Sequence, residues 1–127
     1  MRTALIQITS TDDPKANLVT VQEMLEVAVS KGAEFVLTPE VTNCVSNSRS
    51  RQQDVLELEE HDRTLSELRK AAAQHRIWLL IGSLGLKTGD EDGRFANRSF
   101  LIDPSGEINA RYDKIHMIDV QVTKAET

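Results

Sequence analysis

The chain has 127 residues, which is the length of one domain with a buried core. Its 20 acidic and 15 basic residues give a net charge of −5, and the basic residues are scattered, which argues against a nucleic-acid partner. No apolar run approaches the roughly 20 residues that span a bilayer, and the first residues turn polar too early for a signal peptide. One cysteine and three isolated histidines offer neither an internal disulfide nor metal-ligand spacing. We therefore expect a cytoplasmic protein with neither a metal nor a membrane partner.

The first 37 residues predict one β-α-β unit. Residues 3–8 are short, apolar and β-branched at their centre, as in a buried strand. Residues 12–14 are Asp-Asp-Pro, an N-cap acid followed by proline, and apolar residues then recur at helical spacing until Gly32, a typical helix end. Residues 35–37 predict the next strand, and the intervening helix makes parallel pairing the expected arrangement.

The rest of the chain predicts a second helix and three more strands. Residues 41–60 are polar and acidic, which indicates a long loop with a helical turn around residues 55–58; this loop is either functional or a solvated acidic face. An apolar stripe over residues 65–72 predicts a helix that ends near His75. Three strands follow, separated by turns, at residues 77–82, 95–102 and 107–115. The order β-α-β-α-β-β-β indicates an α/β fold whose mixed sheet is covered by helices on one side.

Two short segments carry the candidate chemistry. Residues 33–40 are an apolar run that ends in Thr-Pro-Glu, and residues 111–119 read Arg-Tyr-Asp-Lys-Ile-His-Met-Ile-Asp. They place Glu40 and Lys114 at or just beyond the end of a strand-like run, where a rigid element aims a side chain and a loop leaves it reachable. Brought together in space, this carboxylate and this ammonium make a plausible base and oxyanion-stabilising pair.

Together these segments resemble the nitrilase, or carbon–nitrogen hydrolase, superfamily. The family has a Pro-Glu after its second strand and a lysine in a Tyr-x-Lys-x-His strand, and the hairpin at residues 97–106 also fits its pattern. The resemblance runs from residue 4 to Lys114. It implies an α-β-β-α sandwich with two mixed sheets, of which this chain is roughly the N-terminal half. Residues 1–127 would then be the N-terminal part of a single carbon–nitrogen hydrolase domain.

The resemblance also implies a function. The parent enzyme would be an amidase that hydrolyses a non-peptide carbon–nitrogen bond through a thioester, with no metal or organic cofactor. Glu40 would be the general base, and Lys114 would stabilise the tetrahedral intermediate. Overall similarity favours the branch that acts on ω-amides of small dicarboxylic acids and related compounds. Subunits of this family pair through helices, so a homodimer or a larger homo-oligomer is expected.

Each candidate residue also has a plain structural interpretation. Glu40 could be a surface or capping acid, and Lys114 could be a lysine on an edge strand. Tyr112 and His116 alternate with Lys114 and share its face of the strand, so we interpret both as supporting or substrate-binding residues. Asn97 could hydrogen-bond the catalytic glutamate or its loop, or it could be a turn residue.

Cys44 lies four residues beyond Glu40 but is not expected to be the nucleophile. In the family the nucleophilic cysteine comes much later, at an elbow beyond the lysine, and Cys44 is the only cysteine here. We interpret Cys44 as a small buried or loop residue. Trp78 lies in a continuous apolar run and is predicted to be core. Residues 82–85 do not lead into a helix and lack the Gly-Lys pair of a phosphate loop.

Three interpretations of the whole chain therefore stand side by side. The favoured one is a truncation, or the ordered part, of a longer amidase that is inactive alone because the nucleophile lies beyond it. The alternative is a truncated or degenerate family member that acts as a non-catalytic association module. The third, a small nucleotide-binding α/β domain, is disfavoured by the lack of a glycine-rich phosphate loop.

Overall fold

The computed structural model describes residues 1–44, 49–89 and 95–113. The helices and strands alternate as predicted. In chain order they are β1 (Thr3–Leu5), α1 (Pro14–Ser30), β2 (Phe35–Leu37), α2 (Arg49–Val55), the short 3-10 helix η1 (Glu59–His61), α3 (Arg63–His75), β3 (Trp78–Lys87), β4 (Phe95–Ile102) and β5 (Ile108–Asp113).

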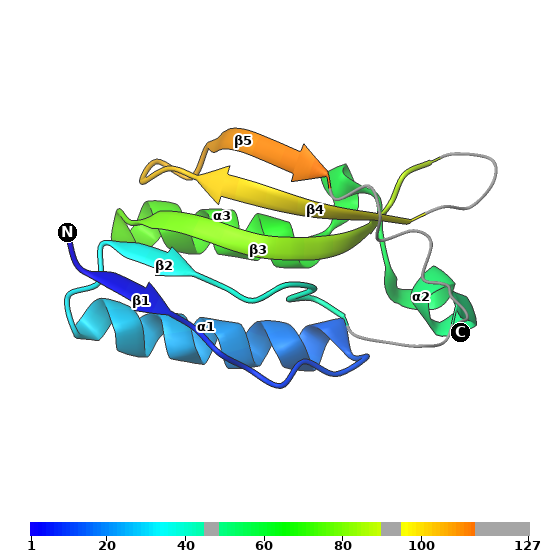
Figure 1. Cartoon of the computed structure of the whole chain (residues 1–127), viewed down its shortest axis with the longest axis horizontal. Coiled ribbons are helices and arrows are strands. Elements are labelled where there is room, and N and C mark those ends of the chain that lie inside the picture. The colour runs from blue at the N-terminus through cyan, green and yellow to red at the C-terminus, as the bar shows by residue number, and fades with distance from the viewer. Residues whose placement is uncertain (45–48, 90–94, 114–127) are drawn as a thin grey trace.

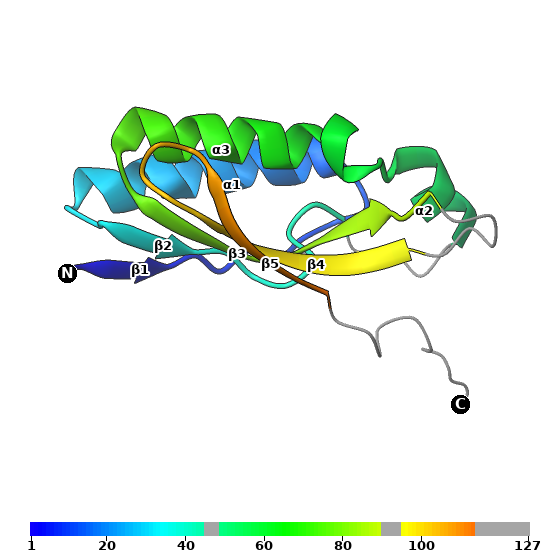
Figure 2. The ribbon, with the colours of Figure 1, turned by 90° about the horizontal axis from the view of Figure 1, so that it is seen from above.

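The five strands form one mixed sheet in the order β1-β2-β3-β4-β5 (Figure 1). The strands β1, β2 and β3 are parallel, because helices connect them, whereas β4 and β5 follow as antiparallel hairpin strands. Figure 2 shows that α1 and α3 lie side by side on the same face of this sheet. The predicted mixed sheet with helices on one side is therefore confirmed.

Helix α1 begins and ends at the residues that the sequence indicates. The Asp13 side chain accepts hydrogen bonds from the backbone N–H groups of Lys15 and Ala16, and Pro14 occupies the first turn, where its missing N–H is harmless. Gly32 follows the helix with a φ of +89°, a conformation that glycine adopts without a steric penalty. Helix α3 is capped in the same way, by the Asp62 side chain.

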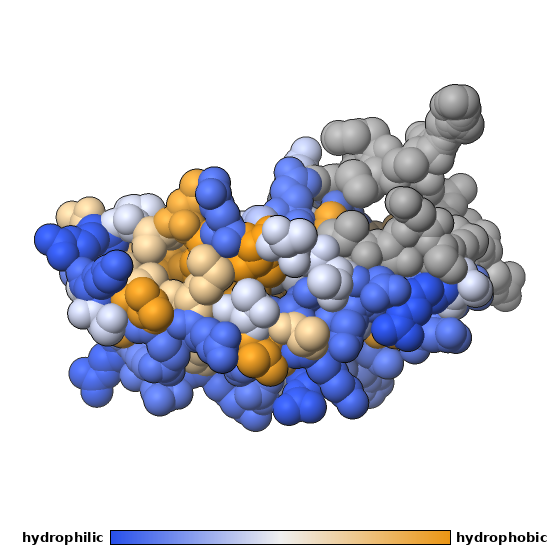
Figure 3. All heavy atoms as spheres, turned by 90° about the horizontal axis from the view of Figure 1, so that it is seen from below, coloured by the Kyte–Doolittle hydropathy of each residue, from blue (hydrophilic) through white to orange (hydrophobic). Residues whose placement is uncertain are grey.

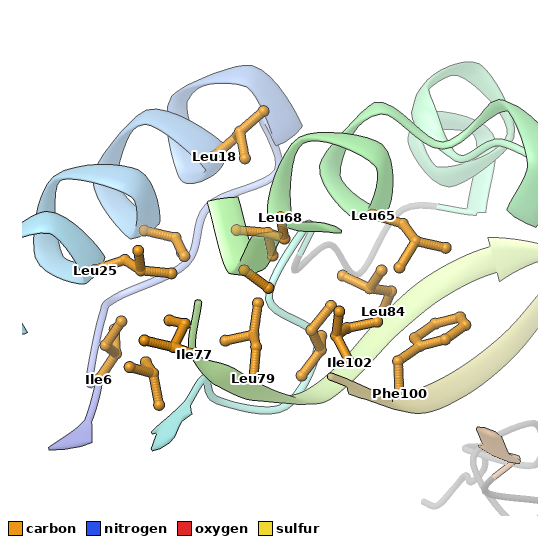
Figure 4. Close-up of a cluster of buried hydrophobic side chains, with 14 of the residues drawn as sticks. Ile6, Leu18, Leu25, Leu65, Leu68, Ile77, Leu79, Leu84, Phe100 and Ile102 are labelled. Carbon is orange, nitrogen blue, oxygen red and sulfur yellow. The ribbon is translucent and has the colours of Figure 1, made fainter. Parts of the chain in front are cut away.

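The hydrophobic core lies between the two long helices and the sheet (Figure 4). Leu25 of α1 and Leu68 of α3 point toward the strands, where Leu79 and Ile102 face them, and Leu18 of α1 belongs to the same buried cluster. These side chains are all buried, and they recur at helical spacing in α1 and α3. Burial of this apolar surface is the main force that holds the helices on the sheet.

The opposite face of the sheet carries no helix in the described part of the chain. The strand register aligns one apolar row across it, formed by Leu5, Leu37, Leu80, Leu101 and Ala110. Leu5 is 64% exposed, and three others of the row are only half-buried. Figure 3 shows hydrophobic residues gathered on the sheet side of the molecule, beside the hydrophilic surface of α1. The described residues thus form one helix-covered sheet, which corresponds to one half of an α-β-β-α sandwich.

Three local predictions were wrong. The helical turn expected at residues 55–58 lies earlier, as α2, because residues 57–58 are extended and pair with Lys87 at the end of β3. Strand β3 continues beyond its predicted end at residue 82, because residues 84–87 pair with residues 95–98 of β4, so residues 82–85 lie inside the strand. Trp78 is half-buried and not core, because the register aligns it with Phe35 on the opposite side of the sheet from Leu79.

None of the helices described here is both long and apolar enough to cross a membrane.

Candidate active site

Glu40 lies on a short turn just beyond the end of the parallel strand β2. Before it, the Thr38 N–H donates to the Leu80 carbonyl at 3.0 Å, and the Gly82 N–H donates to the Thr38 carbonyl at 3.2 Å. The chain is thus hydrogen-bonded to β3 as far as Thr38. Glu40 itself is exposed to solvent among the residues described.

The residue after Glu40 has a strained backbone. Val41 has a φ of +48°, in the left-handed region that a β-branched side chain rarely adopts. Such a conformation costs on the order of 1–3 kcal/mol and persists only where the surroundings enforce it. Here two hydrogen bonds do so: the Val41 N–H donates to Ser83 Oγ at 2.7 Å, and the Thr42 N–H donates to the Ser83 carbonyl at 2.9 Å.

Ser83 can make both bonds because β3 bulges at this point. The strand pairs Ile81 with Phe100 and Leu84 with Arg98, so three steps along β3 match two along β4. The other bulged residue, Gly82, lies so close to the Glu40 turn that a Cβ atom on it would meet the Thr38 oxygen and lie 2.6 Å from the Pro39 carbonyl carbon. The Glu40 turn therefore requires a glycine directly beneath it.

A second anchor holds the chain on the far side of the turn. The side chain of Asn43 is 1% exposed; its Nδ2 donates to the Gly85 carbonyl at 2.8 Å, and its Oδ1 accepts from the Gly85 N–H at 2.9 Å. The Asn43 carbonyl in turn accepts from Asn17 Nδ2 of α1 at 2.9 Å. Glu40 is thus carried between two stretches of chain that are both bonded to β3.

Asn97 lies in strand β4 and not in a turn. It is 5% exposed, and its Nδ2 and Oδ1 atoms have no hydrogen-bond partner among the residues described. Strand alternation places it on the same side of β4 as Ser99, whose Oγ donates to the Gly82 carbonyl. A buried amide without partners costs free energy and calls for an explanation. Its predicted bond to the Glu40 loop is not among the hydrogen bonds of this structure.

The lysine segment lies only partly within the described residues. Tyr112 is in β5 and 67% exposed, whereas Lys114 and His116 lie outside the described residues. The distance between Glu40 and Lys114 therefore remains a prediction.

A cluster of charges fixes the end of β5 just before Lys114. Arg98 donates to Asp113 through Nε and Nη2 and to Glu59 through Nη1 at 2.9 Å, and Arg111 Nη2 donates to Glu59 at 2.7 Å. Burial acts to raise the pKa of Glu59, but the hydrogen bonds and charges of both arginines outweigh it and lower this pKa. The hydrogen bond from Arg98 likewise lowers the pKa of Asp113. Both carboxylates thus stay charged and hold β5 in register.

Cys44 is buried, as predicted, and its Sγ lies 3.7 Å from the Asp12 carbonyl oxygen. Burial raises the pKa of the Cys44 thiol; the charge of Asp12 adds to this effect, and that of Arg51 opposes it. A raised pKa favours the thiol over the reactive thiolate. Within the described residues no group of three or more metal-binding side chains comes together.

Sequence reasoning missed three parts of this site: Ser83, Asn43 and the charge cluster around Arg98. A signal existed for Ser83, because a glycine inside a strand, here Gly82, often marks a bulge or a close approach of another backbone. No local signal identifies the partner of Asn43, which lies 42 residues further along the chain.

The single mixed sheet with helices on one face corresponds to one half of an α-β-β-α sandwich, and Glu40, just beyond a parallel strand, is its candidate base. The profile of the family described as carbon-nitrogen hydrolase matches residues 2–127. The chain therefore belongs to the carbon–nitrogen hydrolase family, the nitrilase superfamily, and is similar to its ω-amidase branch.

Two relatives and one solved structure illustrate the similarity. The chain is 31% identical to a deaminated glutathione amidase of Yersinia enterocolitica, over 94% of this chain and 41% of that protein. It is 28% identical to a chloroplastic ω-amidase of Arabidopsis thaliana, over 93% of this chain and 32% of that protein. The solved structure is a glutamate-to-glutamine mutant of an amidase from Nesterenkonia sp. AN1, with acrylamide added at its active-site cysteine. Its TM-score is 0.72 at 28% identity, over 91% of this chain and 44% of that one. The chain thus spans less than half the length of these relatives.

Proposed function

We propose that residues 1–127 are the N-terminal part of a single carbon–nitrogen hydrolase domain and supply the base and the cation of an amidase. The observation that carries this proposal is the turn at Glu40, because a strained, doubly anchored turn beyond a strand is typical of a functional residue. The match to the family over residues 2–127 supports it independently. The 127-residue chain alone is expected to be inactive.

The proposed reaction proceeds through a thioester. The Glu40 carboxylate takes the proton of a cysteine thiol supplied by the C-terminal part of the domain, and the resulting thiolate attacks the amide carbonyl carbon. Lys114 stabilises the negative oxygen of the tetrahedral intermediate. The carbon–nitrogen bond then breaks, and Glu40 gives its proton to the leaving nitrogen, which departs as ammonia or an amine. Water, deprotonated by Glu40, hydrolyses the thioester and restores the thiol.

The proposed substrate is an ω-amide of a small dicarboxylic acid or a related compound. The names of the relatives, a deaminated glutathione amidase and an ω-amidase, support this class. Asn97, Tyr112 and His116 are proposed to support the site or to contact this substrate. No cofactor is required, because base, cation and thiol account for every proton and bond in the reaction.

The proposed setting is a homodimer or larger homo-oligomer in the cytoplasm. The second candidate function is a non-catalytic association module, favoured by one observation: the exposed apolar row on the helix-free face, which includes Leu5 and Leu101. The two functions differ in whether Glu40 matters, since an association module does not require a carboxylate on that turn.

The test compares this chain with a completed enzyme, by which we mean residues 1–127 joined to the part of the Nesterenkonia amidase that this chain does not cover. Ammonia release from a small ω-amide should be undetectable for residues 1–127 and measurable for the completed enzyme. Circular dichroism checks that both proteins are folded. A folded completed enzyme without turnover would favour the association module, and turnover by residues 1–127 alone would contradict the proposed site.

A further inference from the structure

We infer that Ser83 is a positioning residue: it holds the left-handed turn at Val41 and thereby aims the Glu40 carboxylate. This inference deepens the proposed function and rests on it. Ser83 lies in β3, is fully buried, and is 43 positions away from Glu40 in sequence.

Ser83 accepts two hydrogen bonds from this turn. Its side-chain hydroxyl accepts the Val41 N–H at 2.7 Å, and its backbone carbonyl accepts the next N–H, that of Thr42, at 2.9 Å. Two successive N–H groups of one turn are thus bonded to a single residue of a neighbouring strand. Ser83 is one of the two residues of the β-bulge, and both of its oxygen atoms reach the same turn.

The residues on either side of Glu40 leave its backbone little freedom. Pro39 has its φ fixed by its ring, and Val41 has a stiff β-branched side chain at a φ of +48°. Glycine at position 41 would adopt this φ without strain, yet the chain carries valine. A strained residue kept next to a proposed base indicates that its conformation serves the base and not the stability of the fold.

A purely structural role for Ser83 predicts something different. In that case, loss of the hydroxyl would lower stability but leave the chemistry of Glu40 unchanged. The control variant is Ile102→Val, which removes one methylene from a buried residue of β4 that packs toward the helices. It lowers stability without touching the Glu40 turn.

The first measurement uses residues 1–127 and amide hydrogen exchange followed by NMR. In Ser83→Ala, exchange of the Val41 N–H should accelerate on the order of tenfold, because its acceptor is gone, while the amides of Leu79 and Phe100 in the core strands keep their rates. Ser83→Thr retains a hydroxyl and should restore slow exchange. An unchanged Val41 exchange rate in Ser83→Ala would overturn the inference.

The second measurement uses the completed enzyme and separates kcat from KM. Ser83→Ala should lower kcat on the order of ten- to a hundredfold with little change in KM, since a displaced base affects the chemical step more than binding. Ser83→Thr should recover most of the loss, and Ile102→Val should keep the parental kcat. Full turnover in Ser83→Ala, alongside loss in Glu40→Gln, would overturn the positioning role alone. Full turnover in Glu40→Gln would instead overturn the proposed function, and the positioning role with it.

Discussion

The side-chain amide of Asn43 bonds both backbone groups of Gly85, donating to its carbonyl at 2.8 Å and accepting from its N–H at 2.9 Å. The Asn43 side chain thereby takes the place of a neighbouring strand at a point where β2 has already ended. This lets the chain leave the sheet after Thr38, turn at Glu40 and still satisfy the backbone groups of Gly85, which no residue of β2 reaches. The turn that carries Glu40 is therefore part of the sheet's hydrogen bonding and not a free loop.

Replacement of Asn43 by alanine should destabilise the protein by roughly 2–4 kcal/mol, because it leaves the buried N–H and carbonyl of Gly85 without partners. Urea unfolding followed by circular dichroism measures this loss. The matched control is Asn109→Ala, the same change at an exposed position of β5, which should cost less than about 1 kcal/mol. Equal losses in the two variants would show that the bonds of Asn43 do not stabilise the fold.

Gly82→Ala should destabilise the protein by roughly 1–3 kcal/mol, because the added methyl group collides with backbone atoms of Thr38 and Pro39 that cannot move aside easily. Gly85→Ala is the control in the same strand. There the new methyl group meets the flexible end of the Leu56 side chain at 3.4 Å, so the loss should be smaller. Urea unfolding of both variants checks this order, and a smaller loss for Gly82→Ala than for Gly85→Ala would contradict the close contact.

Stability should depend on pH through Asp103 at the turn between β4 and β5. Hydrogen bonds from the Ser105 hydroxyl, the backbone N–H of Glu107 and other donors lower the pKa of Asp103 to about 2, from an ordinary 3.8. A lowered carboxyl pKa stabilises the folded state above the ordinary value, and this stabilisation is lost as the pH falls from about 4 to about 2.

The variant Asp103→Asn lacks this titration. Its urea midpoint should therefore lie below that of the parent above pH 4, and the two midpoints should converge as the pH approaches 2. The difference between the two proteins cancels the contributions of other carboxylates, such as Glu59. A difference that stays constant from pH 5 to pH 2 would rule out a lowered pKa at this position.

Local signals in the sequence were sufficient to predict most of the architecture. The Asp13–Pro14 helix start, the glycine at position 32 and the alternation of helices with strands are short-range features, and each appears in the structure. The extension of β3 beyond Gly82 was missed because it depends on pairing between residues 84–87 and residues 95–98 of β4, beyond a register shift in β3. Pairing across a bulge leaves no periodic pattern in the strand itself.

The site likewise has features that the local sequence predicts and one that tertiary contacts determine. The position of Glu40 beyond β2 was predicted from neighbouring residues and is confirmed, and Cys44, interpreted as a small buried or loop residue, is buried. The left-handed Val41 could not be predicted, because a β-branched residue is among the least expected at positive φ. The hydrogen bonds that the Val41 and Thr42 N–H groups donate to Ser83 override that preference, and only the folded chain reveals them.

The account as a whole depends on Glu40 being the base while Cys44 is dispensable. The most direct measurement is the rate of ammonia release from a small ω-amide by the completed enzyme and two of its variants. Glu40→Gln should lower kcat on the order of a hundredfold or more, as expected when a general base is lost. Cys44→Ala should stay within a few-fold of the parent, because the Cys44 thiol is buried and its pKa is raised. Abolished turnover in Cys44→Ala, or full turnover in Glu40→Gln, would contradict the account.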